Sequence, residues 1–259
     1  MALNSVVAFW RAYVRTLREI IRLPMTLIVV PLVLPLFMLI IFSRVFERLT
    51  SLGAFGQGNY ITYMAPAAIL MASMLASAGA GVSTAVDRQT GFYDRLRITP
   101  IGSVPSHWGR RAGDATRIAT FAMTLTFFAW LNGAVVNNWL LALVVPALAA
   151  ALWGMAYGGI LFSVCLKTGS AEAYQALLPL FFPILFMSSA FVPAQLLPHW
   201  LEVIASGNPI SYISTLMRSA AKGNIDDWHA TAISVLGTAC VFAATQLLTY
   251  RAGRRVANA

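Results

Sequence analysis

Charged residues are scarce in this chain, which has 259 residues of which only 10% are Asp, Glu, Lys or Arg. A soluble domain is usually about one quarter charged, so this amount of charge cannot cover a water-facing surface of this size. Hydrophobic residues make up 59% of the chain, and the mean hydropathy is +0.73. The composition therefore argues against a soluble enzyme and places most of the chain in lipid.

Acidic residues are the scarcer charge, with 9 Asp and Glu against 18 Lys and Arg. The resulting net charge of +9 suits either nucleic acid or a membrane face. In a chain this apolar it indicates a membrane, because cytoplasmic loops collect Arg and Lys. We therefore expect membrane lipid, and no nucleic acid, among the partners.

Residues that usually carry catalysis or bind metals are also few. Cys165 and Cys240 both lie in apolar runs, so they predict neither a disulfide framework nor a zinc site. The three histidines fall in loops or at the edges of apolar segments. The G-x-x-x-x-G-K-[ST] loop that cradles phosphates is missing. We expect no catalytic residue, no metal and no cofactor in this chain.

Six apolar segments are each long enough to cross a bilayer as a helix, which needs about 20 residues. They are residues 25–42, 60–86, 118–136, 139–166, 173–192 and 230–250. Their apolar runs are continuous rather than alternating, which favours helices over barrel strands. The sequence predicts an all-α polytopic membrane protein with six transmembrane helices in one domain, residues 1–259.

The basic residues predict the orientation of these spans. With the N-terminus in the cytoplasm, fourteen of the 18 Lys and Arg residues fall on the inner side and four on the outer side. Positive residues collect on the cytoplasmic side of membrane proteins. We therefore expect a multi-pass protein of the cell inner membrane with both termini cytoplasmic.

Residues 4–23 precede the first apolar segment and carry four arginines spaced 4, 3 and 4. These are Arg11, Arg15, Arg18 and Arg22. At about 100° per residue they form a stripe about 60° wide, with Phe9, Tyr13 and Ile20 on the opposite side. The pattern predicts a basic amphipathic helix in the cytoplasmic interface, ending ahead of Pro24. It serves either as a headgroup anchor or as a collar that also contacts a cytosolic partner.

The predicted cytoplasmic loop 87–117 holds six arginines and three aspartates beside aromatic residues. Residues 87–97 predict a short helix that Pro100 terminates. Aromatic and Arg side chains dominate protein interfaces, so the composition favours a docking element over a solvated loop.

After the fifth segment, residues 193–212 read as an external helical hairpin. Pro193 and Pro198 separate it from the preceding span, and Asn208 with Pro209 forms a turn. It is too short and interrupted to cross the bilayer, so we expect a re-entrant or interfacial hairpin before the last span.

Two further features concern the spans themselves. Small residues recur every four positions at Ser73, Ser77 and Gly81, and at Gly154 and Gly158. This spacing predicts close helix packing. The spans also lack ionisable residues, which ion-coupled transporters normally need. Energy for transport must then come from a separate subunit.

Two stretches resemble the membrane subunits of ABC exporters of the second permease class, the daunorubicin-resistance and nodulation-export type. One is D-R-x-x-G-F-Y-D-R-L-R-I-T-P at residues 87–100. The other is F-V-P-x-x-x-L-P-x-W-L-x-x-I-x-x-x-N-P-I-S-Y at residues 191–212, followed by Arg218. The likeness covers nearly the whole chain, from the amphipathic helix to the basic tail.

This resemblance implies a permease that pairs with a second copy or a paralogue above two cytosolic ABC ATPase subunits, which bind ATP and Mg. Residues 87–97 would form the coupling helix, although family members often carry Glu in place of Asp87 and Asp94. The coupling residues would be Asp87, Arg88, Gly91, Phe92, Tyr93, Asp94, Arg95, Leu96 and Arg97. The external gate would comprise Pro193, Pro198, Trp200, Asn208 and Pro209.

The expected function is ATP-driven export of an amphipathic drug, lipid or glycolipid by alternating access. The alternatives are a polysaccharide-exporting permease of the same family and an ATP-independent secondary carrier. A function outside transport, as a membrane enzyme or a scaffold, is a further alternative. An enzyme would need titratable groups that converge at one depth, and the sequence shows no such set.

Overall fold

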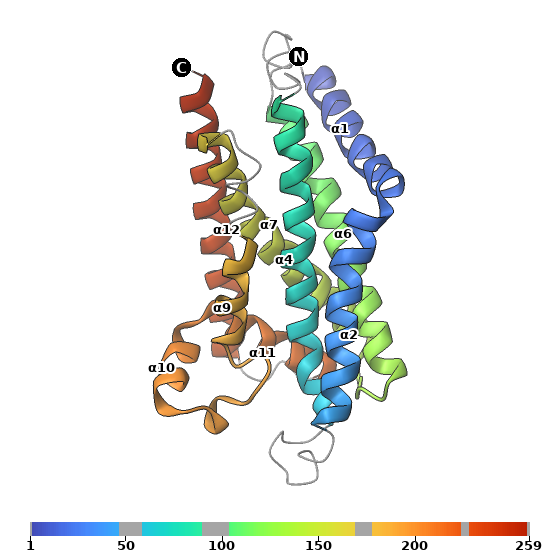
Figure 1. The fold of residues 1–259 in the computed structure, drawn as a ribbon, viewed down its shortest axis with the longest axis vertical. Coiled ribbons are helices and arrows are strands. Elements are labelled where there is room, and N and C mark those ends of the chain that lie inside the picture. Colours follow the sequence, from blue (N-terminus) through green and yellow to red (C-terminus); the bar gives the residue numbers. More distant parts are fainter. Residues whose placement is uncertain (1, 47–58, 90–103, 169–177, 224–227, 258–259) are drawn as a thin grey trace.

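The computed structural model describes residues 2–46, 59–89, 104–168, 178–223 and 228–257. Within these ranges every regular element is a helix, and no strand occurs. The long helices are α2 (Val30–Val45), α4 (Tyr60–Gln89), α6 (Val104–Leu131), α7 (Trp139–Thr168) and α12 (Trp228–Ala257). Figure 1 shows them running along the long axis, with both chain ends at one end of the bundle.

In the described part of the chain, three apolar helical stretches are long enough to cross a membrane. They are Met25–Val45, Tyr60–Ala78 and Trp139–Leu161, with mean hydropathies of 2.8, 1.5 and 2.0. They coincide with the predicted spans 25–42, 60–86 and 139–166. A shorter apolar helix, Thr231–Leu247, lies in the predicted span 230–250. The all-helical membrane class is confirmed, while the count of six crossings stays a prediction.

Helix α4 forms the centre of the bundle, with α2, α6 and α7 packed around it (Figure 1). In the apolar stretch of α4, 83% of the residues are buried inside the protein, against 22% in Met25–Val45. The side chains of Met64, Leu70 and Met74 are fully buried. Small residues between them let three neighbouring helices approach, so α4 needs no lipid contact to satisfy its apolar surface.

The N-terminal segment is helix α1 (Ala2–Arg22), as predicted for residues 4–23 ahead of Pro24. A π-helical turn, Met25–Val29, then leads into α2. Pro31 lacks the backbone N–H that would bond to the carbonyl of Leu27, and such gaps favour wider turns. The chain changes direction at this junction, so α1 leaves the line of α2 (Figure 1).

Helix α6 runs across the predicted boundary between loop 87–117 and span 118–136, and the place of that boundary in the membrane stays a prediction. Helix α4 continues to Gln89 and α6 begins at Val104, so residues 104–117 are helical. Pro105 suits a first helical turn, and no further proline interrupts the helix. At the other end α6 stops at Leu131, because Gly133 takes a left-handed turn with φ of 96°.

The predicted fifth span, 173–192, differs in its described part. It contains a 3₁₀ turn, Leu178–Leu180, and the short helix α9 (Phe181–Phe186), after which the chain turns. The side-chain amide of Asn208 donates hydrogen bonds to the carbonyls of Ile184 and Met187 at 2.7 and 3.1 Å. These bonds satisfy backbone acceptors at the end of α9. Residues 169–177 lie outside the described part.

The external segment 193–212 forms short helices, as expected. They are a 3₁₀ turn (Ala194–Leu196), α10 (His199–Gly207) and α11 (Pro209–Lys222). In Figure 1, α10 and α11 lie at the end of the bundle opposite the two chain termini. Helix α11 runs ten residues beyond the predicted hairpin, and Gly223 closes it in the left-handed region at φ 76°.

Candidate functional site

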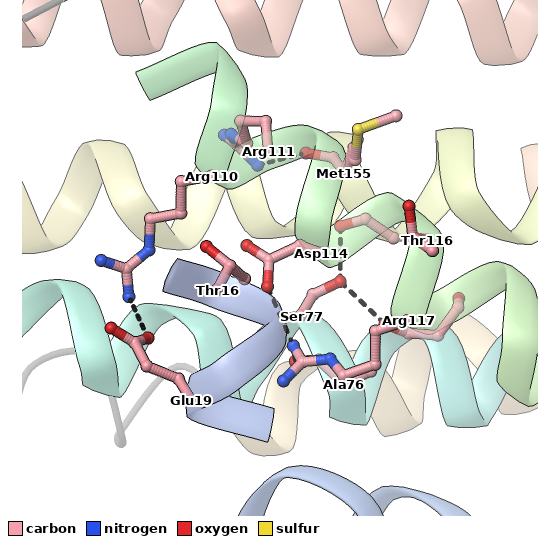
Figure 2. Close-up of polar contacts among 12 residues, drawn as sticks. Thr16, Glu19, Ala76, Ser77, Arg110, Arg111, Asp114, Thr116, Arg117 and Met155 are labelled. Atoms are coloured by element: carbon pink, nitrogen blue, oxygen red, sulfur yellow. Dashed lines mark hydrogen bonds and ion pairs between the residues drawn. The ribbon is translucent and has the colours of Figure 1, made fainter. Parts of the chain in front are cut away.

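A group of polar side chains lies where α1, α4, α6 and α7 meet, towards the end of the bundle that carries the termini (Figure 2). Arg110 on α6 approaches Glu19 on α1 at 3.8 Å, and Glu19 also accepts a hydrogen bond from Arg15 at 3.0 Å. One carboxylate thus joins the basic stripe of α1 to the first half of α6.

Deeper in this group, Arg117 is buried with its side chain only 3% exposed. It pairs with Asp114 one turn earlier at 3.2 Å and donates to the carbonyl of Ala76 on α4 at 2.7 Å. A buried guanidinium needs such acceptors, because an unpaired buried charge is costly. The hydrogen bond from Arg117 to Ala76 therefore fixes α6 against α4.

Arg111 faces the other side of α6 and reaches α7, where it donates to the carbonyl of Met155 at 3.1 Å. Glycines make room for it. A Cβ at Gly159 would lie 3.2 Å from the Arg111 guanidinium and 3.2 Å from Thr245 on α12. Arg111 thus occupies the junction of α6, α7 and α12.

The predicted close packing of small residues is confirmed between α4 and α7. Ser77 donates a hydrogen bond to the carbonyl of Gly154 at 2.6 Å. A Cβ at Gly154 would lie 2.9 Å from Ser77 and 2.7 Å from Ile118. The two backbones approach closely only because position 154 has no side chain.

Sequence reasoning missed the buried charges of this group. The predicted span 118–136 does lack ionisable residues, but the helix that carries it also buries Arg111, Asp114 and Arg117. The signal was present as an Asp–Arg pair at i, i+3, in a stretch with no helix breaker after Pro105. The high charge density of residues 110–117 favours a loop when the sequence is taken alone, whereas these residues belong to helix α6.

His107 lies one turn into α6, before the apolar stretch that begins at Ile118. Burial of the imidazole, and secondly the charges of Arg111 and Arg110, lowers the pKa of His107 to about 4. The side chain is therefore neutral at physiological pH and adds no further charge to the group.

The predicted coupling residues fall mostly outside the described part of the chain. Asp87 and Arg88 lie in the last turn of α4. Gly91, Phe92, Tyr93, Asp94, Arg95, Leu96 and Arg97 lie within 90–103, which is not described. The two helices that flank this segment are the ones joined by the Arg117–Ala76 contact.

The external gate residues predicted from sequence occupy helix boundaries. Pro193 and Pro198 precede the 3₁₀ turn and α10, and Pro209 opens α11. Asn208 caps α11 by accepting the backbone N–H of Ile210 at 3.0 Å. Trp200 is 60% exposed on α10, so it is available to lipid or to a partner.

Arg218 on α11 makes the most extensive polar contact at this end. Its Nε donates to the carbonyl of Tyr63 at 3.0 Å, and its Nη2 to those of Ser189 and Ala190 at 2.9 Å each. The guanidinium also lies 3.7 Å from the centre of the Tyr63 ring, a cation–π contact. Burial lowers the pKa of Arg218 to about 10, which leaves it cationic at neutral pH.

Tyr63 completes this contact from α4 by donating its hydroxyl to the carbonyl of Ser189 at 2.7 Å. Arg218 therefore donates to a backbone carbonyl in the first turn of α4. The sequence placed Arg218 beside the external motif but did not identify its partners.

The turn between α6 and α7 joins the same end of the bundle. Asn59 donates to the carbonyl of Gly133 at 2.6 Å, and Thr62 accepts the N–H of Val135 at 2.9 Å. Asn137 donates its backbone and side-chain N–H groups to carbonyls at the end of α11. The start of α4, the α6–α7 turn and α11 therefore form one connected structure.

Within the described residues, no group of three His, Cys, Asp or Glu side chains is arranged to hold a metal ion. The buried charged groups are arginines held by carbonyls and carboxylates. Such an arrangement can lock helices together, and it offers no nucleophile with an adjacent base.

The family described as ABC-2 type transporter matches residues 7–221. A daunorubicin resistance ABC transporter permease protein, DrrB1 of Streptomyces coeruleorubidus, is 26% identical over 84% of this chain and 77% of its own length. A putative transport permease, ycf38 of Cyanophora paradoxa, is 27% identical over 74% of this chain and 66% of its own. The ycf38 protein of Porphyra purpurea is also 27% identical, over 67% and 59%.

Proposed function

This chain belongs to the ABC-2 type transporter family, and on that premise we propose that it exports an amphipathic substrate across the cell inner membrane. Membership makes it the membrane permease component of an ABC transporter, whose ATPase is a separate subunit. Beyond family membership, we propose the direction of transport, the chemical class of the cargo and the transport mechanism. One relative is named for resistance to a drug, daunorubicin, which supports an amphipathic cargo.

The proposed topology has six crossings, with both termini and residues 87–117 in the cytoplasm. The distribution of Lys and Arg supports this orientation. The shared end of the N- and C-termini in Figure 1 supports an even number of crossings. Two ATPase subunits would then bind at that end, beneath this permease and a second copy or a paralogue.

In the proposed mechanism, residues 87–97 receive the motion of the ATPase and pass it to the spans. A lever requires rigid attachment on both sides. The observation that carries this role is the buried Arg117 of α6, which pairs with Asp114 on the same helix and donates to the carbonyl of Ala76 on α4. The helices on either side of the segment therefore move together, and α7 follows through Arg111 and Ser77.

At the opposite end, α10 and α11 would close the exit. Their connection to α4 through Arg218 and Tyr63 supports this role, because tilting of α4 would then displace α11. Alternating access would follow from rocking of these connected helices about the close α4–α7 contact.

The experiment is copurification of the tagged permease with its ATPase, followed by ATP turnover in proteoliposomes. Replacing Asp94, Arg95 and Leu96 together by Ala should reduce ATPase recovery and substrate-stimulated turnover at least tenfold. The matched control replaces His199, Glu202 and Ser206 of α10 by Ala and should leave recovery unchanged.

A gradient-driven carrier is the second candidate, because Asp114 is a buried carboxylate in a helix that carries a predicted span. Its pairing with Arg117 at 3.2 Å favours a structural role. Flux by the permease alone down an ion gradient, without any ATPase, would contradict the ATP-driven proposal.

A further inference from the structure

Two of the long helices, α4 and α7, each contain one proline near the end of the bundle that carries α11. Pro66 lies six residues after the first residue of α4, and Pro146 seven residues after the first residue of α7. A proline inside a helix has no N–H for the carbonyl four residues earlier. The carbonyls of Thr62 and Ala142 therefore lose the helical donor that another residue would supply. The first turn of each helix is held less firmly to the remainder.

Both prolines line the same cavity, which has a volume of about 30 Å³ and lies between α4, α6, α7 and α11. Thr62 and Ala142 also line it. Much of the remaining wall consists of small side chains, among them Ala129. A close-packed interior resists bending because its side chains interlock. Space beside the two prolines instead lets the neighbouring helices change their angle.

The segments on the α11 side of the prolines are tied together by hydrogen bonds. Thr62 accepts the backbone N–H of Val135 in the α6–α7 turn at 2.9 Å. Asn137 in that turn donates to the carbonyls of Ala221 and Lys222 at the end of α11, at 2.9 and 3.0 Å. The first turn of α4, the α6–α7 turn and α11 are therefore joined as one body. We call this body the α11 unit, and it consists of residues 59–65, 132–145 and 209–223.

On the other side of the prolines, α4 and α7 are in close contact. Ser77 donates to the carbonyl of Gly154 at 2.6 Å, and a Cβ at Gly154 would lie 3.0 Å from the carbonyl oxygen of Ser73. Ser77 is eleven residues from Pro66, and Gly154 is eight from Pro146, which correspond to about 16 and 12 Å of helix. This contact leaves little room for movement, so bending concentrates at the prolines.

From these observations we propose that Pro66 and Pro146 together form a hinge, about which the α11 unit tilts while the Ser77–Gly154 contact stays closed. One proline in a membrane helix is tolerated as a feature of packing alone. Here two prolines border one cavity, and the helices that contain them enter the same hydrogen-bonded unit, so their bends share one axis. The purpose of this movement rests on the proposed export function, in which tilting of α11 opens the exit.

Pulsed electron paramagnetic resonance on the purified full-length protein in lipid nanodiscs tests the hinge. In a C165A/C240A background, one spin label is placed at Lys222 in the α11 unit and the other at Ile160 in the second half of α7, both exposed positions. The reference pair is Ile160 with the exposed Leu247 of α12, which packs on α7. An excess of unlabelled protein removes distances between copies. The Lys222–Ile160 distance distribution should be about twofold wider or more than the reference, because the hinge separates only that pair.

P66A/P146A should narrow this distribution to the width of the reference pair, because each alanine restores an N–H for the carbonyl of Thr62 or Ala142. The matched control is P105A, the same substitution in the first turn of α6. Position 105 is the second residue of that helix, so no helical carbonyl lies four residues before it. P105A should leave the width unchanged.

A129V supplies a second route to the same result. It keeps both prolines and adds two methyl groups at the wall of the cavity, so it should also narrow the distribution. The hinge is overturned if the distribution with both prolines present is as narrow as the reference, or if P66A/P146A and A129V both leave it wide. It is also overturned if P105A narrows it as much as P66A/P146A.

Transport and ATPase recovery are measured on the same variants. P66A/P146A should lower ATP-driven transport in proteoliposomes about fivefold or more, as loss of a gating movement does, with ATPase recovery unchanged. A wide distribution in a protein that shows no ATP-driven transport would contradict the export proposal and support the hinge. The two failures are therefore distinguishable.

Discussion

At the scale of single residues, Arg218 shows how one side chain joins three segments. Its two donating nitrogens reach carbonyls of α4 and of the turn after α9, and its planar face lies on Tyr63. The fork of a guanidinium serves several acceptors at once, whereas an ammonium is a compact point donor. The geometry of the group therefore matters as well as its charge.

This difference makes a prediction for Arg218. R218K should lower the free energy of unfolding by about 2–3 kcal/mol, because buried carbonyls lose charged donors. R218Q should cost at least as much. K222Q, at the exposed end of the same helix, is the control and should change little. Thermal denaturation of the purified permease measures the effect. An R218K variant as stable as the wild type would contradict the role assigned to Arg218.

At the scale of elements, the contact between α1 and α6 depends on glycine. A Cβ at Gly109 would collide with the carbonyl oxygen of Phe9, and one at Gly113 would lie 2.7 Å from Thr16. Backbone atoms of a helix cannot move aside as a side chain can. The distance between these two helices is therefore set by positions that have no side chain.

G109A should accordingly separate α1 from α6 and destabilise the protein by about 1–3 kcal/mol, as overpacking does. The control is G237A on α12, where a Cβ would meet nothing within 4 Å. G237A should be neutral or slightly stabilising, because Ala favours helix over Gly. Limited proteolysis within α1 and the melting temperature report both effects. Equal melting temperatures for the two variants would refute the close approach.

At the scale of the whole molecule, polar contacts occur at both ends of the bundle. Arginines of α6 connect α1, α4 and α7 at the end with the termini. Arg218 connects α11 with α4 at the other end. Helix α4 takes part at both ends and its apolar stretch is the most buried of the three, so α4 is the element through which the proposed mechanism would connect the two ends.

The proposed orientation of the whole molecule is testable by labelling. In a variant with Cys165 and Cys240 replaced by Ala, single cysteines are placed at Ser206 or at Asn258. A membrane-impermeant maleimide applied to intact cells should label S206C at once, and N258C only after permeabilisation. The reverse pattern would invert the topology and would place residues 87–117 outside.

Much of the architecture followed from composition and periodicity. Apolar run length predicted spans at 25–42, 60–86 and 139–166, because lipid demands about 20 apolar residues per crossing, and apolar helical stretches are found at Met25–Val45, Tyr60–Ala78 and Trp139–Leu161. The α1 helix and its end before Pro24 followed from arginine spacing and from proline. Residues 87–100 and 191–212 carried the family resemblance, which the match to the ABC-2 type transporter family confirmed.

Tertiary structure alone decided where the charged residues of α6 belong and what the faces of α1 contact. Local sequence reports the preference of an isolated segment, in which a cluster of arginines favours water over lipid. In the folded chain Ala76, Met155 and Glu19 supply acceptors from three other helices. Those acceptors offset part of the cost of burying the guanidinium groups, and no linear pattern specifies partners about 40 or 90 residues away.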